Sequence, residues 1–139
     1  MERLVGVINT LSKKLRRFCD RSTANMGLTG TQGQVLRYIF IRSQCQELYQ
    51  RDIEDVFDIR RSTATGILQL LEKKGYIKRI SVPTDARLKK IVITTKAQEL
   101  RDQVVYETER SDQLLKKGLS KDEIDFYIRI SDRICNNIT

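Results

Sequence analysis

The sequence predicts a mainly α-helical protein with one small β-hairpin. Apolar residues recur at helical spacing through most of the chain, and two β-branched, basic segments flank a turn near residue 85. The length of 139 residues suits a single domain, which we assign to 1–139. The formal net charge is +8, and the segment from Arg60 to Lys90 alone contributes +7, from nine basic and two acidic residues. Such clustering of one sign favours a polyanionic partner.

The first predicted helix covers residues 2 to about 23 and is amphipathic. Leu4, Ile8 and Leu11 recur on one face at helical spacing, and the other face carries lysine and arginine. We interpret this basic face as solvated charge, with a distant phosphate contact as the alternative. The apolar face predicts packing against another element.

Two further helices are expected before residue 60. The first begins at Thr29, because Thr29 and Gln32 have the spacing of a capping box. The second is short and lies within 48–58, with acidic residues on its polar side. Its expected apolar side consists of Ile53, Val56 and Phe57.

A helix over about 60–75 carries most of the functional information. One face is apolar at helical period, and it consists of Ala64, Ile67, Leu68 and Leu71. The opposite face is small, polar or basic, so it can approach a phosphate backbone and hydrogen-bond base edges. Gly75 ends this helix, because glycine readily adopts the left-handed conformation found after a helix C-terminus. A surface helix with a solvated face is the alternative interpretation.

The hairpin is expected over about 77–94. Segments 77–82 and 89–94 are β-branched and basic, and 83–88 between them begins with turn residues. The order of helix, tight connection, helix and basic hairpin is typical of a winged helix-turn-helix, which we assign to 29–94. This order favours the DNA-binding interpretation of the preceding helix.

The same stretch resembles the multiple antibiotic resistance regulator (MarR) family of bacterial transcription factors. The most specific part is the run Leu-Glu-Lys-Lys-Gly-Tyr-Ile at 71–77, followed by Asp85 and Arg87 of the wing. Further matches are Gln50–Glu54, Ser62–Thr65 and Ile93–Thr94. The family has helices on both sides of this motif, so the resemblance covers nearly the whole chain. It implies a dimeric repressor of a palindromic double-stranded DNA operator, and a small-molecule effector that changes DNA affinity.

The resemblance and the exposed helix face together select candidate DNA contacts. On the helix, the candidates for base and phosphate contacts are Arg60, Arg61, Ser62, Thr63, Thr65 and Gln69. On the wing, Arg87 is expected to reach the flanking backbone or minor groove, and Lys89 and Lys90 to contact phosphates. Asp85 is expected to orient the Arg87 guanidinium, with a plain turn aspartate as the alternative.

Two positions depart from the family pattern at helix starts. Arg60 stands where a serine or threonine commonly caps the recognition helix, and Tyr49 stands where a small capping residue commonly precedes the first motif helix. Losing a cap costs about 1 kcal/mol, which packing can offset. An arginine at the entry of the recognition helix changes which bases or phosphates are within reach.

The C-terminal third is predicted to be helical. Thr95 and Gln98 have capping-box spacing and begin a linking helix over 95–114, whose polar middle is typical of a helix that bridges two parts. Ser120 and Glu123 form another capping box, which begins a last amphipathic helix. This arrangement separates the DNA-binding motif from the C-terminus.

The terminal regions, 1–28 and 115–139, are the expected dimerisation helices. The resemblance implies that they interlock with their copies in a homodimer, because one chain offers few other surfaces to cover two amphipathic helices. The residues expected near this interface are Leu4, Ile8, Leu11, Ile128 and Ile134. Bundling of the two helices within one chain is the alternative.

Composition argues against other classes of protein. The chain has no histidine, no Cys-x-x-Cys pair and no Walker-type glycine loop, so neither an enzyme nor a cofactor or metal site is expected. No signal peptide or membrane-spanning stretch is expected either. Three widely spaced cysteines suit a reducing cytoplasm.

Two alternatives to a DNA-binding regulator remain within this fold. A winged-helix module that binds protein instead of DNA often loses the basic wing, which this chain retains. A thiol redox sensor needs an accessible cysteine of low pKa, and Cys19 is the candidate because arginines surround it in the sequence. The tyrosines and cysteine position of peroxide-sensing relatives are missing. We interpret Cys45 and Cys135 as structural.

Overall fold

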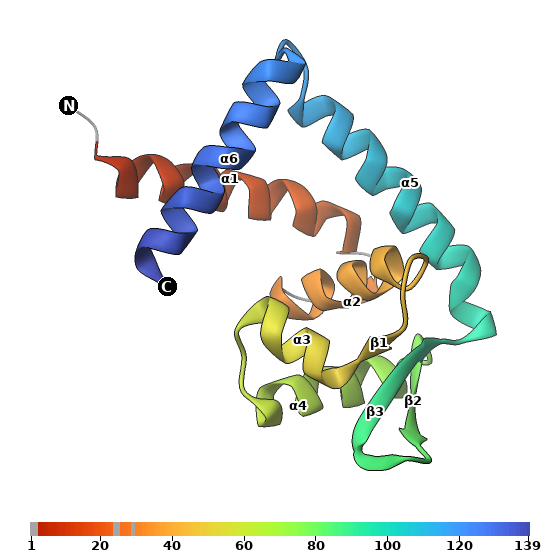
Figure 1. Cartoon of the computed structure of the whole chain (residues 1–139). Helices are drawn as coiled ribbons and strands as arrows, with labels where there is room; N and C mark the ends of the chain where they lie inside the picture. Colours follow the sequence, from red (N-terminus) through yellow and green to blue (C-terminus); the bar gives the residue numbers. More distant parts are fainter. Residues whose placement is uncertain (1–2, 24–25, 29) are drawn as a thin grey trace. The chain divides into compact units, whose positions relative to one another are not determined.

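The computed structural model describes residues 3–23, 26–28 and 30–139, which form two compact units. The first unit spans Met1–Val105 and the second spans Tyr106–Thr139, so the boundary falls within one helix, α5. The elements are α1 (Leu4–Thr23), α2 (Gly30–Arg42), β1 (Leu48–Tyr49), α3 (Gln50–Phe57), α4 (Arg61–Lys73), β2 (Ile77–Val82), β3 (Asp85–Ile93), η2 (Thr95–Ala97), α5 (Gln98–Leu115) and α6 (Lys121–Ile138) (Figure 1). The predicted fold class, mainly α with a winged hairpin, is confirmed.

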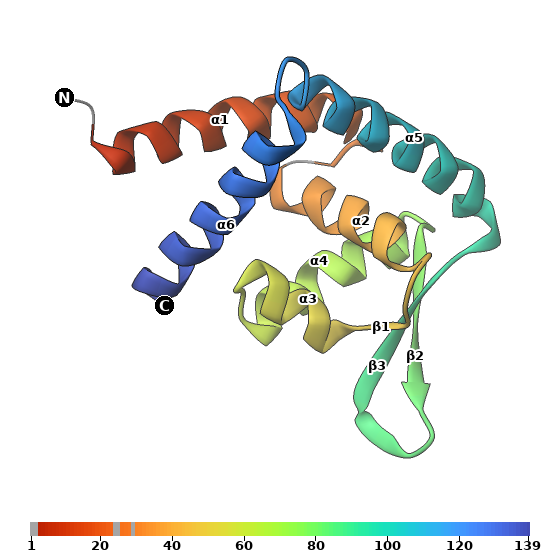
Figure 2. The ribbon, with the colours of Figure 1, turned by 45° about the horizontal axis from the view of Figure 1, so that its top comes forward.

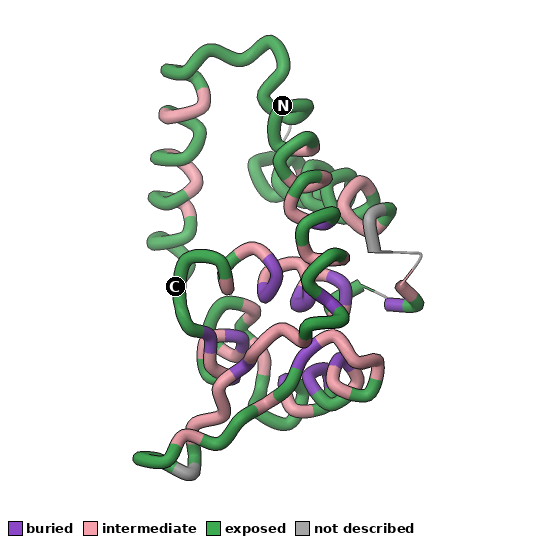
Figure 3. Tube along the Cα trace, turned by 90° about the vertical axis from the view of Figure 1, so that its right-hand side faces the viewer, coloured by how far each residue is buried: buried purple, intermediate pink, exposed green. Residues whose placement is uncertain are grey.

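The core of the first unit lies where α2, α3 and α4 pack on the sheet. Phe40, Ile53 and Leu68, one from each helix, are fully buried, and Leu48 and Ile91 from the sheet are nearly so. Figure 3 shows the buried positions concentrated in these elements. The apolar stripe predicted for α4 is therefore the face that packs inward.

One position on α3 differs from the prediction. Ile53 is buried and Phe57 is partly buried, but Val56 is 53% exposed. Successive residues of a helix are about 100° apart, so Val56 lies about 100° from Phe57 around the axis. A helix of eight residues with one packed side leaves that direction in solvent.

Gly75 ends α4 as predicted. Its φ is +81°, and its N–H donates to the carbonyl of Glu72 while the N–H of Tyr76 donates to the carbonyl of Leu71. These two bonds form a Schellman motif, which satisfies carbonyls that the last helical turn leaves without partners. The chain then turns directly into the wing.

The wing has the predicted extent, but its second strand begins earlier than the β-branched segment at 89–94. The strands follow the order β1-β3-β2 and are antiparallel, with Ile77 opposite Ile93 and Leu48 opposite Ile91. The turn consists of residues 83 and 84, where the sequence has its turn residues, and β3 already begins at Asp85. Cross-strand pairing with β2 extends the strand past its β-branched part.

Capping at the later helices is partly as predicted. The cap before α5 is Thr94 and not Thr95, because the Thr94 hydroxyl accepts from the N–H of Ala97 and a 3-10 turn precedes the helix. At α6, the reciprocal bonds between Ser120 and Glu123 confirm the predicted capping box. The start predicted at Thr29 lies outside the described residues, as does Glu2 at the start of the first predicted helix.

The two terminal helices are poorly covered. In the first unit, α1 lies over α2 (Figure 2), where Arg37 of α2 donates to the carbonyl of Cys19 at 2.7 Å. The apolar residues Leu4, Ile8 and Leu11 of α1 are nevertheless exposed. In the second unit, α6 has no buried residue. Among the described residues, no helix has the length and apolar character needed to cross a membrane.

Candidate nucleic-acid interface

The outward face of α4 carries most of the residues selected from the sequence. The inward face, with Ala64, Leu68 and Leu71, is buried, which turns the opposite face to solvent. The exposed candidates there are Arg60, Arg61, Ser62, Thr63 and Gln69. Thr65 is half-buried. The helix therefore presents arginine, hydroxyl and amide groups without competing core contacts.

Neither Tyr49 at the start of α3 nor Arg60 at the start of α4 caps its helix with its own side chain, as the departures at these two positions predicted. Arg60 is the extended residue before α4 and makes no capping bond. At α3, the Asp52 carboxylate reaches back and accepts from the N–H of Tyr49 at 2.9 Å. The Arg60 side chain is thus free of a capping role and lies exposed at the helix entry.

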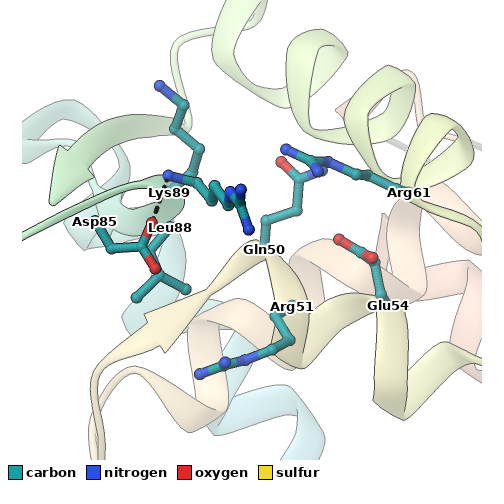
Figure 4. Close-up of a pocket in the computed structure, with 8 residues that line it drawn as sticks. Gln50, Arg51, Glu54, Arg61, Asp85, Leu88 and Lys89 are labelled. Atoms are coloured by element: carbon teal, nitrogen blue, oxygen red, sulfur yellow. Dashed lines mark hydrogen bonds between the residues drawn. The ribbon is translucent and has the colours of Figure 1, made fainter.

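A groove of about 290 Å³ separates α3 and α4 from the wing (Figure 4). Its lining is charged, with four cationic and two acidic side chains. The lining residues are Gln50, Arg51, Glu54, Arg61, Asp85, Arg87, Leu88 and Lys89. The structure thus brings Arg61 of the helix together with Arg87 and Lys89 of the wing.

Lys90 lies apart from this group. Neighbouring side chains of a strand point to opposite faces, so Lys89 and Lys90 face opposite sides of β3. Lys89 donates to the Ser81 hydroxyl at 2.8 Å, whereas Lys90 forms an ion pair with Glu47 at 2.9 Å. The hydrogen bond between Lys90 and Glu47 raises the pKa of Lys90 and lowers that of Glu47.

Asp85 does not have the role predicted for it. Its carboxylate accepts from the backbone N–H of Arg87 at 2.9 Å, and no ion pair joins it to the Arg87 guanidinium among the described residues. This is the turn aspartate of the alternative interpretation, because aspartate commonly bonds the backbone two residues later. The Arg87 side chain is exposed.

Sequence reasoning missed Gln50 and Arg51 at the first turn of α3. Gln50 is the one buried polar residue among the described positions, with 7% of its surface exposed, and its amide donates to the Thr65 hydroxyl at 2.8 Å. Arg51 is exposed and adds a fourth cation to the groove. Both lie in the motif Gln-Arg-Asp-Ile-Glu, but only the fold brings them beside α4 and the wing.

The candidate cysteines differ in exposure. Cys19 is partly buried and its carbonyl accepts from Arg37, while Cys45 and Cys135 are exposed. Among the described residues, no disulfide joins any of the three. Cys45 and Cys135 therefore do not pack in the core, and the structural role predicted for them is wrong.

Comparison with known proteins places these features in context. The MarR family profile matches residues 26–88. The HTH-type transcriptional regulator BilQ of Clostridioides difficile (strain CD3) is 26% identical over 122 residues, which are 88% of this chain and 80% of BilQ.

Solved structures of similar fold cover the whole chain. The transcription regulator MarR from Oenococcus oeni PSU-1 is 30% identical, with a TM-score of 0.81 over 96% of this chain and 99% of that protein. S. aureus MepR in complex with DNA is 21% identical, with a TM-score of 0.82 over 100% of both chains. The second likeness concerns the fold alone, since its sequence identity is low.

Proposed function

The chain belongs to the MarR family of transcriptional regulators, and we propose that it acts as a homodimer that binds a palindromic double-stranded DNA operator and represses transcription. The family consists of regulators and not enzymes, so the proposal concerns how the side chains of this chain recognise DNA. We infer that the protein acts in the cytoplasm, as expected for a regulator that binds bacterial DNA.

One observation carries the proposal of sequence-specific DNA binding. Arg61 of α4 and Arg87 and Lys89 of the wing line one groove beside an α4 face that is free of core contacts. Major-groove readout needs such a helix face, and the wing cations are suited to the adjacent phosphates. In this arrangement α4 contacts the base edges, while the wing and Arg51 contact the phosphate backbone of the DNA.

The proposal of a dimer rests on the terminal helices. Leu4, Ile8 and Leu11 on α1 and Ile128 on α6 are 40–58% exposed, although all four are large and apolar. Ile134 on α6 is partly buried. A second copy would cover these faces and present two recognition helices to major grooves about 34 Å apart on one side of the duplex.

A groove in the first unit supports the proposed small-molecule effector. It has a volume of about 420 Å³ between α1, α2 and α3 and is mainly apolar. Leu15, Tyr38 and Phe57 supply apolar surface, and Arg16 and Arg37 supply charge. An anionic molecule with an aromatic or aliphatic body fits this lining. Its binding would shift α2 and α3, and with them the recognition helix.

Selection of bound sequences from a random duplex pool tests the proposal. We expect enrichment of one sequence with two-fold symmetry, because two identical recognition helices read two identical half-sites. Enrichment without symmetry would contradict the dimer. A protein that shifts no duplex even at low salt would contradict DNA binding and favour a protein-binding winged helix.

A further inference from the structure

Four polar side chains from α3, α4 and β2 are joined by three hydrogen bonds beside the groove, and α4 connects the two ends of this chain because it carries both terminal residues. The Gln50 amide nitrogen donates to the Thr65 hydroxyl at 2.8 Å, and the Gln50 amide oxygen accepts from Arg79 Nη1 at 3.3 Å. Arg79 Nε donates to the Glu72 carboxylate at 2.7 Å. We call Gln50, Thr65, Glu72 and Arg79 the polar ring.

The polar ring holds the recognition helix at two points. Thr65 and Glu72 both belong to α4 and are seven residues apart, which is about two helical turns or about 10 Å along the axis. Residues at this spacing lie on the same side of a helix. Because Gln50 comes from α3 and Arg79 from the wing, the two contacts fix the rotation of α4 about its axis relative to both.

The middle of the polar ring is shielded from solvent. Gln50 is 7% exposed, and the Arg79 side chain is 17% exposed. A buried amide that loses a partner leaves a polar group without hydrogen bonds, which disfavours any rotation of α4 that breaks the ring. The rotation of α4 about its axis also sets the direction of its side chains at the groove, including Arg61 one turn before Thr65.

We propose that Gln50 is a positioning residue for base readout, because it locks the recognition helix to the wing through Thr65 and Arg79. This inference rests on the proposed DNA-binding function. Arg79 shares the role, since its guanidinium joins Gln50 to Glu72. Discrimination between operator and other DNA then depends on two residues that make no base contact.

The test compares the full-length wild-type protein with Gln50→Met, Arg79→Lys and the double variant. Methionine keeps the length of glutamine but removes both hydrogen bonds, and lysine keeps the charge of arginine but not its forked geometry. Gln44→Met, at an exposed position before β1, is the matched control. Each protein is titrated at several salt concentrations with the selected operator and with a scrambled duplex.

We expect Gln50→Met to lower the operator-to-scrambled affinity ratio about three- to tenfold, the effect of one or two lost hydrogen bonds. The salt dependence should stay unchanged, because no phosphate contact is lost. The double variant should lose no more than the stronger single variant, since both break the same ring. Gln44→Met should match the wild type.

Three outcomes would overturn the inference. Equal loss of affinity for both duplexes in Gln50→Met would mean that Gln50 only stabilises the fold, which the melting temperature would also report. Independent, additive losses in the double variant would mean that the two residues act separately. A wild-type protein without any sequence preference would refute the proposed function itself, and this is visible before any variant is compared.

Discussion

Large apolar side chains are buried in the winged part of the molecule, whereas many of those in the terminal helices are exposed. In α2, α3 and α4, residues such as Leu36, Ile53 and Leu68 are fully buried within the first unit. In α6, Ile128 and Phe126 are more than half exposed, although the helix is strongly amphipathic. The winged part therefore has a core of its own, whereas α6 has an apolar face without a cover in its unit.

The two regions also differ in what holds their secondary structure. The recognition helix α4 is fixed by core packing and by the polar ring, and it tolerates Arg60 without a cap. The start of α6 depends on the bonds between Ser120 and Glu123. Local capping matters most where tertiary packing within the chain is weak.

The largest effect is expected from Leu68→Ala in the winged core. Deleting a fully buried leucine should lower the free energy of unfolding by about 2–5 kcal/mol, because a cavity remains. Chemical denaturation followed by circular dichroism measures it. The control Val56→Ala, at an exposed position of α3, should stay within about 0.5 kcal/mol of the wild type. Equal losses in both would mean that Leu68 does not contribute more to the core than Val56 does.

The next effect concerns the uncovered helix α6. Ile134→Asp places a charge in the proposed apolar interface, so we expect the dimer dissociation constant to rise at least about tenfold and operator affinity to fall with it. Analytical ultracentrifugation at micromolar concentration measures the assembly. Asn136→Asp adds the same charge to an exposed position on α6 and should leave the dimer intact. A wild-type protein that sediments as a monomer would refute the proposed interface.

Arg61→Ala tests base reading by the exposed face of α4. The free-energy gap between operator and scrambled DNA should shrink by about 1–3 kcal/mol, the value of one good bidentate base contact. Fluorescence anisotropy on the two duplexes measures the gap. Arg42→Ala removes an exposed arginine at the end of α2, outside the groove, and serves as the control. If Arg61→Ala weakens both duplexes equally, Arg61 contacts phosphate instead of base.

Lys89 and Lys90 allow a comparison within one strand. Lys89 lines the groove, so Lys89→Ala should flatten the slope of log affinity against log salt by about 0.9, the contribution of one phosphate contact. Lys90→Ala should change the slope less, because Lys90 faces the other side and pairs with Glu47. Equal slopes in the two variants would mean that DNA binding draws Lys90 away from Glu47.

The smallest effect concerns acid stability at the start of α6. The backbone N–H of Ser120 donates to Glu123 and lowers the pKa of this carboxyl below its ordinary value of 4.5. A lowered pKa in the folded state contributes stability above pH 4.5, which is lost as the pH falls through the folded-state pKa. The melting temperature of Glu123→Gln should therefore lie slightly below that of the wild type at pH 7 and approach it in acid. A difference that persists at low pH would mean that the charge of Glu123 is not involved.

Local patterns in the sequence determined the fold class and much of the candidate site. The apolar stripe of α4, the helix end at Gly75 and the capping box at Ser120 depend on residues within a few positions of one another, so their spacing alone predicts them. Arg61, Arg87 and Lys89 could be selected because the exposed face of the helix and the resemblance of the wing to the MarR family both pointed to them.

Only the tertiary structure decided which of these residues act together. The separation of Lys89 from Lys90 depends on strand register, and the exposure of Val56 depends on how α3 is rotated against its neighbours. The polar ring joins Gln50 to Arg79 across 29 positions of sequence, so no local pattern indicates it. Contacts of this kind form when packing brings distant elements together. The sequence therefore could not predict that Gln50 bonds to Thr65 and Arg79.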